Sequence, residues 1–165
     1  MNQGKHKNLW LELTVIVASV LALALLVYFV MIVSFQSGVS STNVTMRLAG
    51  RIARTVFEDP EQEQIETVSR MIRYGAHLAL FFVVGLVTAF VSMVIFRGYF
   101  RIAGILLSGA VCYMLAYYTE YFKQYVDGRH FQMTDVQLNW YGCLAGIFCM
   151  VGSYFLNRLL VKMST

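Results

Sequence analysis

Charged residues are scarce in this chain. Of its 165 residues only 13% are charged, 58% are hydrophobic, and a single proline interrupts the sequence. Soluble domains average about 25% charged and about 45–50% apolar residues, so this composition argues against a soluble globular domain and favours a lipid bilayer as the solvent. The length leaves no room for a separate soluble domain, and no internal repeat or low-complexity linker is present.

The motifs of common catalytic and metal sites are also missing. The sequence contains no nucleophile elbow, zinc motif or phosphate-cradling glycine loop. Cys112, Cys143 and Cys149 lie inside apolar runs at spacings that suit neither a disulfide framework nor a metal site, so we expect them to pack. A net charge of +4 without a basic groove-binding module suits anionic lipid better than nucleic acid. We therefore expect no metal, no cofactor and no nucleic-acid partner.

What the chain does contain is long apolar runs. Four stretches carry no charged residue: 13–35, 78–96, 102–119 and 136–157. Each has roughly 18 residues or more, enough for a helix to cross a hydrocarbon core of about 30 Å, whereas barrel strands would be short and alternating. We predict an all-α integral membrane protein, one domain over 1–165, forming a bundle of four transmembrane helices at about 10–35, 72–96, 102–121 and 136–158. The first run exceeds the roughly 7–15 residues of a signal-peptide core and has no Ala-x-Ala site, so it should remain as an anchor.

One long connection separates the first two spans, and it is amphipathic. Within residues 44–57 one helical face is apolar and the other carries Arg47, Arg51 and Arg54. This pattern predicts a helix lying in the membrane interface, with packing on the bundle as an equal alternative. The following Asp59-Pro60-Glu61-Gln62 resembles a helix start, with Asp59 as N-cap and Gln62 in a capping box, so the second membrane helix should begin near Pro60.

Ionisable residues collect at one edge of the apolar runs. On a continuous second helix Arg70, Arg73 and His77 share a face, since they are three and four residues apart. A cation at this depth needs a carboxylate, a phosphate or a water-filled pocket. A lone histidine in a membrane helix is more often a packing residue, but the neighbouring Arg73 favours a shared polar site.

The start of the fourth span carries a second polar stripe. Its members are spaced four, three and four residues apart: Asp135, Asn139, Gly142 and Gly146. The two glycines form a small-xxx-small motif, which predicts that this face packs closely on another helix. Gly104 and Ser108 of the third span offer a matching surface, and Thr134 or Asp135 is a natural N-cap for the fourth helix. Such small-residue faces also allow a homo-oligomer.

The polar positions, taken in order, resemble a known signature. They read Arg73-x-x-x-His77, then Glu120 followed by Gly128-Arg129, then Asp135-x-x-x-Asn139-x-x-Gly142-x-x-x-Gly146. This order resembles the VanZ-like family of small membrane proteins over essentially the whole chain, and Ser34-Phe-Gln-Ser-Gly-Val-Ser-Ser resembles that family's Ser/Gln-rich segment. Similar sequences usually have Asp where Thr119 stands and Gln where Lys123 stands, so we expect Glu120 to have fewer supporting polar neighbours here.

The resemblance implies a bacterial protein associated with reduced susceptibility to teicoplanin, a glycopeptide antibiotic that acts outside the cytoplasmic membrane. The positive charges divide six to seven between the two sides and do not decide the orientation. The short turn Arg97-Gly-Tyr-Phe-Arg101 resembles a cytoplasmic hairpin. We therefore expect a multi-pass protein of the bacterial cytoplasmic membrane with both termini in the cytoplasm and the polar site facing outward.

Three hypotheses for function follow. In the first, the site binds or remodels an anionic headgroup of a membrane lipid or lipid-linked cell-wall component: Arg73, Arg129 and Asn139 hold the headgroup, and Glu120 and Asp135 orient the arginines. In the second, the same charges form a salt-bridge network in a structural or partner-binding protein. The third is an intramembrane hydrolase or transferase in which His77, Glu120 and Asp135 are the catalytic candidates. No catalytic activity is assigned.

Overall fold

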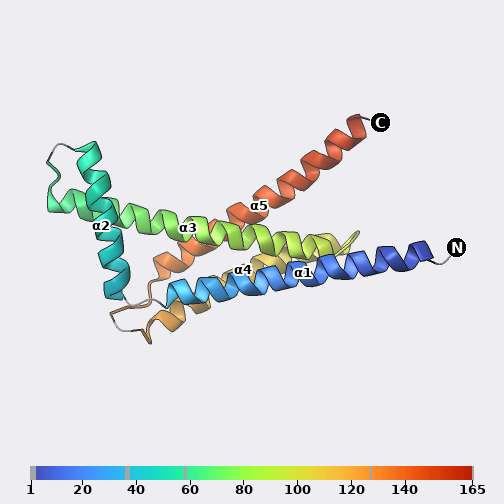
Figure 1. Cartoon of the computed structure of the whole chain (residues 1–165), viewed down its shortest axis with the longest axis horizontal. Helices are drawn as coiled ribbons and strands as arrows, with labels where there is room; N and C mark the ends of the chain where they lie inside the picture. Colours follow the sequence, from blue (N-terminus) through green and yellow to red (C-terminus); the bar gives the residue numbers. More distant parts are fainter. Residues whose placement is uncertain (1–2, 36–37, 58, 127, 165) are drawn as a thin grey trace.

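The computed structural model describes residues 3–35, 38–57, 59–126 and 128–164, with side chains described from Trp10 in the first helix and from Asn43 in the second. Within these ranges the chain folds into five helices and no strand (Figure 1). They are α1 (Gln3–Ser34), α2 (Gly38–Val56), α3 (Gln62–Ile95), α4 (Phe100–Lys123) and α5 (Met133–Met163). The all-α prediction is confirmed, as is the order of four long apolar helices with a shorter one after the first.

Four helices are long and apolar enough to cross a membrane: α1 from Trp10, α3, α4 and α5. Helices α3, α4 and α5 extend beyond the predicted spans at one end or both, whereas the apolar part of α1, Trp10–Ser34, lies within the predicted 10–35. The largest extension is in α3, whose 34 residues measure about 50 Å at 1.5 Å per residue, against a hydrocarbon core of about 30 Å. The first turns of α3 therefore lie beyond the length that a membrane span requires.

The ends of α3 and α5 have specific causes. Glu61 has extended backbone angles and forms a capping box with Gln64, so α3 begins at Gln62 rather than with Asp59 as N-cap. The expected start near Pro60 was right to within two residues, but the expected capping residues were wrong. In α5 the N-cap is Gln132, and Asp135 lies inside the first turn instead of capping it. Between α3 and α4, Gly98 adopts a φ of 60°, which glycine accepts without strain.

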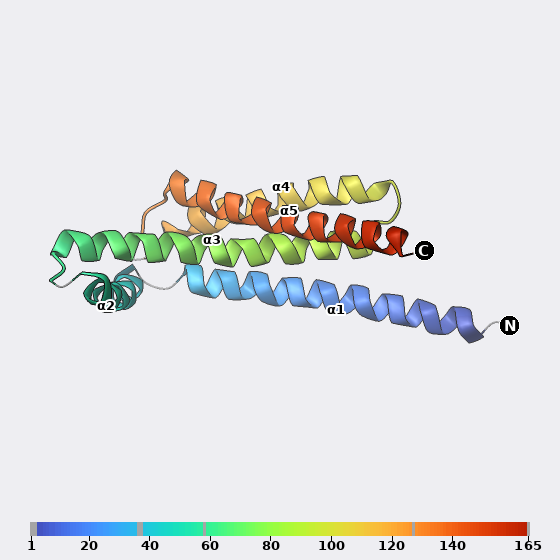
Figure 2. The ribbon, with the colours of Figure 1, turned by 90° about the horizontal axis from the view of Figure 1, so that it is seen from above.

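Helix α3 is the central element. Figure 2 shows α4 and α5 on one side of it and α1 and α2 on the other. The buried core lies along α3 and its neighbours and is made of Val30, Phe81, Val84, Ala89, Cys112, Ala116, Val136, Cys143 and Ile147. Beyond Ile147 helix α5 diverges from the other helices (Figure 1), and the rest of its length is largely exposed. The bundle is thus closed only along part of its length.

At the described glycines, the closest contacts between helix backbones are those of α3 with α5. A Cβ at Gly146 would lie 2.1 Å from the carbonyl oxygen of Phe82, and one at Gly85 would lie 2.1 Å from that of Cys143. The small-residue face of α5 therefore packs on α3, and the expectation that Gly104 and Ser108 of α4 provide its partner is wrong. Gly104 lies against the ring of Phe96 instead. A third glycine, Gly85, supplied the space on α3.

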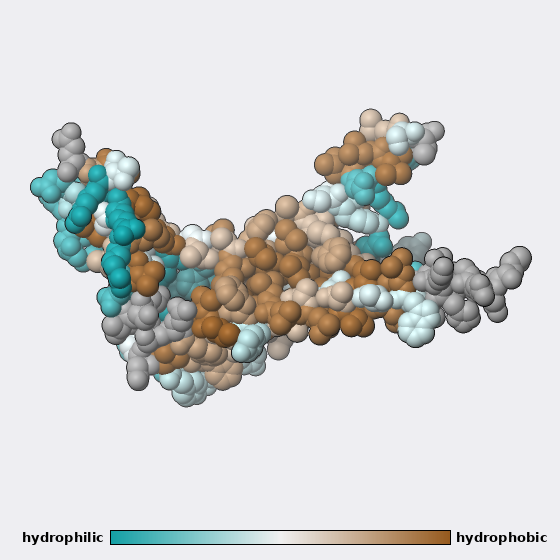
Figure 3. All heavy atoms as spheres, viewed as in Figure 1, coloured by the Kyte–Doolittle hydropathy of each residue, from teal (hydrophilic) through white to brown (hydrophobic). Residues whose placement is uncertain are grey.

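Helix α2 lies across the first part of α3, transverse to the direction shared by α1 and α3 (Figures 1 and 2). It packs through the fully buried Ala49 and Ala53. A second apolar stripe on α2 stays exposed: Val44, Leu48, Ile52 and Val56. The face drawn in Figure 3 shows an apolar middle with hydrophilic residues gathered at α2 and near the C-terminal part of α5. This distribution is what a membrane-crossing bundle with polar ends requires.

Candidate functional site

The predicted polar residues lie at the end of the molecule where α2 crosses α3. Helix α3 supplies Arg73 and His77, the end of α4 supplies Glu120, the start of α5 supplies Asp135 and Asn139, and the connection between α4 and α5 supplies Arg129. Asp135 and Asn139 are one turn apart on the face of α5 that also carries its close-packed glycines. The contacts that bring α5 onto α3 thereby also bring these polar side chains together.

The link between α3 and α5 is a hydrogen bond between His77 and Asn139. Nδ1 of His77 lies 3.0 Å from Oδ1 of Asn139, whose side chain is buried. An amide oxygen only accepts, so in this arrangement Nδ1 carries the proton and Nε2 remains an acceptor. One turn away, a Cβ at Gly142 would lie 2.6 Å from the carbonyl oxygen of Leu78. The glycine permits the close approach that puts the histidine within reach of the amide.

Glu120 is paired within its own helix. It forms a buried ion pair with Lys123, one turn further along α4. Sequence reasoning treated Lys123 only as a departure from similar sequences, yet its three-residue spacing from Glu120 is that of an intrahelical ion pair. Thr119, the other departure, donates its hydroxyl to the carbonyl oxygens of Leu115 and Ala116. Lys123 therefore belongs to the site as the counterion of a buried carboxylate.

Arg129 follows Gly128, whose φ of 72° turns the chain back toward the bundle. Its backbone N–H donates to the carbonyl oxygen of Val126 at 3.1 Å. Burial lowers the pKa of the Arg129 guanidinium, the charges of Glu120 and Asp135 raise it, and that of Arg73 lowers it. Because arginine titrates far above neutrality, the side chain stays charged. These electrostatic interactions also show that the charges of α3, α4 and α5 act on one another.

A small cavity lies on the α1 and α2 side of this group, and we call it the inner cavity. Its volume is about 120 Å³. It is lined by Val33, Ser34, Thr45, Arg73, Ala76, His77, Leu80 and Arg129. The structure thus brings Arg73, His77 and Arg129 around one space, while Asn139 lies behind His77, and Glu120 and Asp135 do not line it. Of the Ser/Gln-rich segment at 34–41, only Ser34 and Phe35 have described side chains.

The hydrogen bonding around the inner cavity is incomplete. Among the described residues neither Arg73 nor Arg129 forms an ion pair with a carboxylate. Buried atoms without a hydrogen-bond partner in this part of the chain are Nε of Arg73, Nε of Arg129, Oε2 of Glu120, Oδ1 of Asp135 and Nδ2 of Asn139. Buried polar groups are normally satisfied, so a cluster of this kind needs an explanation. The ranges that the structure describes contain no group of His, Cys, Asp and Glu able to hold a metal ion.

Comparison with known proteins gives one family. A family model described as VanZ/LLP1 matches residues 19–157, a range that includes α2 and every residue of the site. No curated protein and no solved structure matches the chain significantly.

Proposed function

The chain belongs to the VanZ/LLP1 family, and we propose that its polar site binds or remodels an anionic headgroup of a cell-envelope lipid or lipid-linked wall precursor. By doing so it lowers susceptibility to teicoplanin-type lipoglycopeptides. The protein is a multi-pass protein of the bacterial cytoplasmic membrane. The site faces outward, and both termini are cytoplasmic.

The inner cavity is the observation that supports this proposal. Two arginines and a histidine line it, and its volume of about 120 Å³ is well above the roughly 10–15 Å³ that a single water needs. It therefore has room for a small anionic group such as a phosphate or a carboxylate. An anion placed there would accept hydrogen bonds from both guanidinium groups, which are the strongest donors for such oxygens.

The charge balance also favours a bound anion over a closed network. The site contains three cations, Arg73, Lys123 and Arg129, and two carboxylates, Glu120 and Asp135, so it carries one excess positive charge with His77 neutral. A purely structural network gains most when every member is satisfied. The Glu120–Lys123 pair fits a structural role, but the five unpaired buried atoms and the excess charge do not. An anionic ligand would offset the excess charge and accept hydrogen bonds from Nε of Arg73 and Nε of Arg129, the two unpaired donors of residues that line the inner cavity.

A hydrolase or transferase is favoured by one observation. The Ser34 hydroxyl belongs to a buried residue that lines the inner cavity with His77, which is oriented by Asn139. A serine, a histidine and an amide that orients the histidine are the components of nucleophilic catalysis. Ser34→Ala tests whether the site remodels its ligand or only holds it. A binding site would keep its headgroup affinity and its protective effect in this variant, whereas an enzyme would keep the affinity and lose the effect.

The placement of the helices supports the membrane arrangement. Both chain ends lie at the end of the molecule opposite α2 (Figure 1), as four crossings require. Helix α2 lies transverse to the long helices, and its exposed stripe of Val44, Leu48, Ile52 and Val56 can insert between lipids while its arginines reach phosphates. The alternative of α2 packed on the bundle also has support, because Ala49 and Ala53 are buried on α3. The exposed apolar face of α2 is available to lipid, and its other face, with Ala49 and Ala53, packs on α3.

The experiment measures protection and fold stability in the same variants. Arg129→Gln and Asp135→Ala are expressed in a susceptible bacterium, and Arg158→Gln, an exposed residue near the opposite end, serves as the matched control. We expect the first two to lose teicoplanin protection without a change in the melting temperature of the purified protein. Loss of protection together with melting would support the structural role. Full protection at normal expression would refute the headgroup site.

A further inference from the structure

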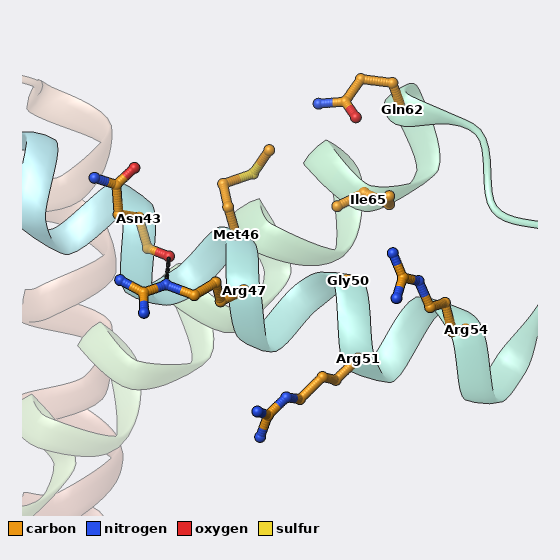
Figure 4. A pocket seen from close by; sticks show the side chains of 8 residues that line it. All are labelled: Asn43, Met46, Arg47, Gly50, Arg51, Arg54, Gln62 and Ile65. Carbon is orange, nitrogen blue, oxygen red and sulfur yellow. Dashed lines mark hydrogen bonds between the residues drawn. The ribbon is translucent and has the colours of Figure 1, made fainter.

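A groove lies between α2 and the first turns of α3, and we call it the outer groove. Its volume is about 520 Å³, inside the range of about 300–1,000 Å³ typical of ligand pockets. It is lined by Asn43, Met46, Arg47, Gly50, Arg51, Arg54, Gln62 and Ile65. In Figure 4, Arg54 reaches toward Gln62 and Ile65, while Arg47 and Arg51 both extend toward the Asn43 end of α2.

The three arginines of the outer groove have no carboxylate partner among the described residues. Arg47 donates from Nε to the carbonyl oxygen of Asn43 at 3.3 Å (Figure 4), a bond within its own helix that keeps the side chain directed toward this end. Three unneutralised guanidinium groups on one helix attract anions, and their planar donors suit phosphate oxygens. The outer groove is therefore an anion site separate from the inner cavity.

A third space shares lining residues with both of the others, and we call it the middle cavity. Its volume is about 220 Å³, and its walls are Thr45, Met46, Glu66, Ser69, Arg70 and Arg73. It shares Met46 with the outer groove and shares Thr45 and Arg73 with the inner cavity. Its walls mix one acid, two bases and hydroxyl groups, and Arg70 already donates to the hydroxyl of Thr67 at 3.2 Å. Because Glu66 offsets part of this charge, whereas no acid among the described residues lines the outer groove, we assign the middle cavity the least charged part of a ligand that spans all three spaces.

The sizes and charges of the three spaces together define a ligand. The inner cavity would hold one anionic group, the middle cavity an uncharged polar linker, and the outer groove a second anionic group. From Thr45, which lines the inner cavity, to Arg51 is six residues of α2, about 9 Å along the helix axis. We infer that the ligand carries two phosphate groups joined by a short uncharged polyol, one phosphate bound by Arg73 and Arg129 and the other by Arg47 and Arg51. This inference rests on the proposed function of the inner cavity.

The test compares lipids that differ in the number of phosphates. Native mass spectrometry of the full chain in detergent measures binding of cardiolipin, whose two phosphates are joined by glycerol, and of phosphatidylglycerol, which has one. We expect cardiolipin to bind at least about tenfold more tightly, a difference of about 1.4 kcal/mol. Arg47→Gln/Arg51→Gln should bring the ratio close to one and leave phosphatidylglycerol binding unchanged. Arg73→Gln/Arg129→Gln should weaken both lipids.

The control removes the same charge elsewhere. Arg97→Gln/Arg158→Gln changes exposed residues near the opposite end and should alter neither affinity. A wild-type ratio near one, or a ratio that survives Arg47→Gln/Arg51→Gln, would overturn the two-phosphate inference while the inner site stands. If neither lipid responds to Arg73→Gln/Arg129→Gln, the proposed function itself fails and the inference fails with it.

A soluble competitor distinguishes a lipid from its free headgroup. Displacement of cardiolipin by glycerol-1,3-bisphosphate and not by glycerol-1-phosphate would support the two-phosphate requirement and identify the free headgroup as sufficient. Displacement by neither, with the lipid preference intact, would support the requirement and assign part of the affinity to the acyl chains. Equal displacement by both compounds would contradict it.

Discussion

The contact between α3 and α5 gives the sharpest prediction of stability. A methyl group at Gly146 would lie 2.1 Å from the carbonyl oxygen of Phe82 and 2.7 Å from the amide nitrogen of Leu86. Both neighbours are backbone atoms, so relief requires the helices to separate by roughly an ångström. Overpacking of this kind costs about 1–3 kcal/mol, while replacing a helical glycine by alanine gains about 0.5–1 kcal/mol. We expect Gly146→Ala to lose about 1–2 kcal/mol in the free energy of unfolding.

Gly152→Ala is the matched control for this prediction. Gly152 lies on the same helix, and a methyl group there meets nothing within 4 Å. Both variants share the gain in helix propensity, so the difference between them measures the steric cost alone. Thermal unfolding of the purified proteins should show Gly146→Ala below the wild type and Gly152→Ala at or above it, with about 2–4 °C for each kcal/mol. If the two variants melt together, the close approach of α3 and α5 is wrong.

Two further predictions concern the buried polar groups of α4. Lys123→Met should lower the melting temperature strongly, because it leaves Glu120 as an unpaired buried charge at a cost of about 3–5 kcal/mol. The double variant Lys123→Met/Glu120→Gln should recover most of this loss. If Lys123→Met alone melts like the wild type, the ion pair is excluded. Ser108→Ala should cost only about 0.6–1.7 kcal/mol, since it removes the 2.6 Å hydroxyl contact with Ser92 and leaves no buried charge unpaired. A loss as large as that of Lys123→Met in the same thermal unfolding assay would contradict this explanation.

Much of the fold follows from the sequence because the membrane constrains it. Uncharged runs of roughly 18 residues locate the long helices, since lipid-exposed backbone must satisfy its own hydrogen bonds. The amphipathic stretch at 44–57 likewise corresponds to α2. The helix ends were less accurate: Asp59 and Glu61 are both acids near the same helix start, and only the backbone angles show that Glu61 forms the capping box. Local sequence patterns predict that a helix forms, whereas its first residue depends on the backbone angles.

Which helix meets which could not be read from spacing. The interval between Gly142 and Gly146 defines a face of α5, and small residues on either neighbouring helix could receive it. The two glycines pack on the backbone of α3 at Leu78, Phe82 and Leu86, and between these contacts Gly85, an isolated glycine with no motif around it, receives the backbone of Cys143. The case of Lys123 is different: its spacing from Glu120 is compatible with an ion pair inside α4, and only the burial of both side chains shows its importance. Spacing along one helix predicts which of its faces is packed, and only the packed structure shows which helix that face contacts.

Lys123 also alters what the site can bind. Without a lysine at position 123, the carboxylate of Glu120 would be free to pair with Arg129. In this chain Lys123 takes Glu120, and the charge of Glu120 acts on Arg129 without pairing with it. Arg129 is thereby left for a ligand. Lys123→Gln should therefore weaken both cardiolipin and phosphatidylglycerol binding in the native mass spectrometry titration, with the ratio of the two affinities unchanged. Unchanged affinities for both lipids would show that Lys123 serves only to neutralise Glu120.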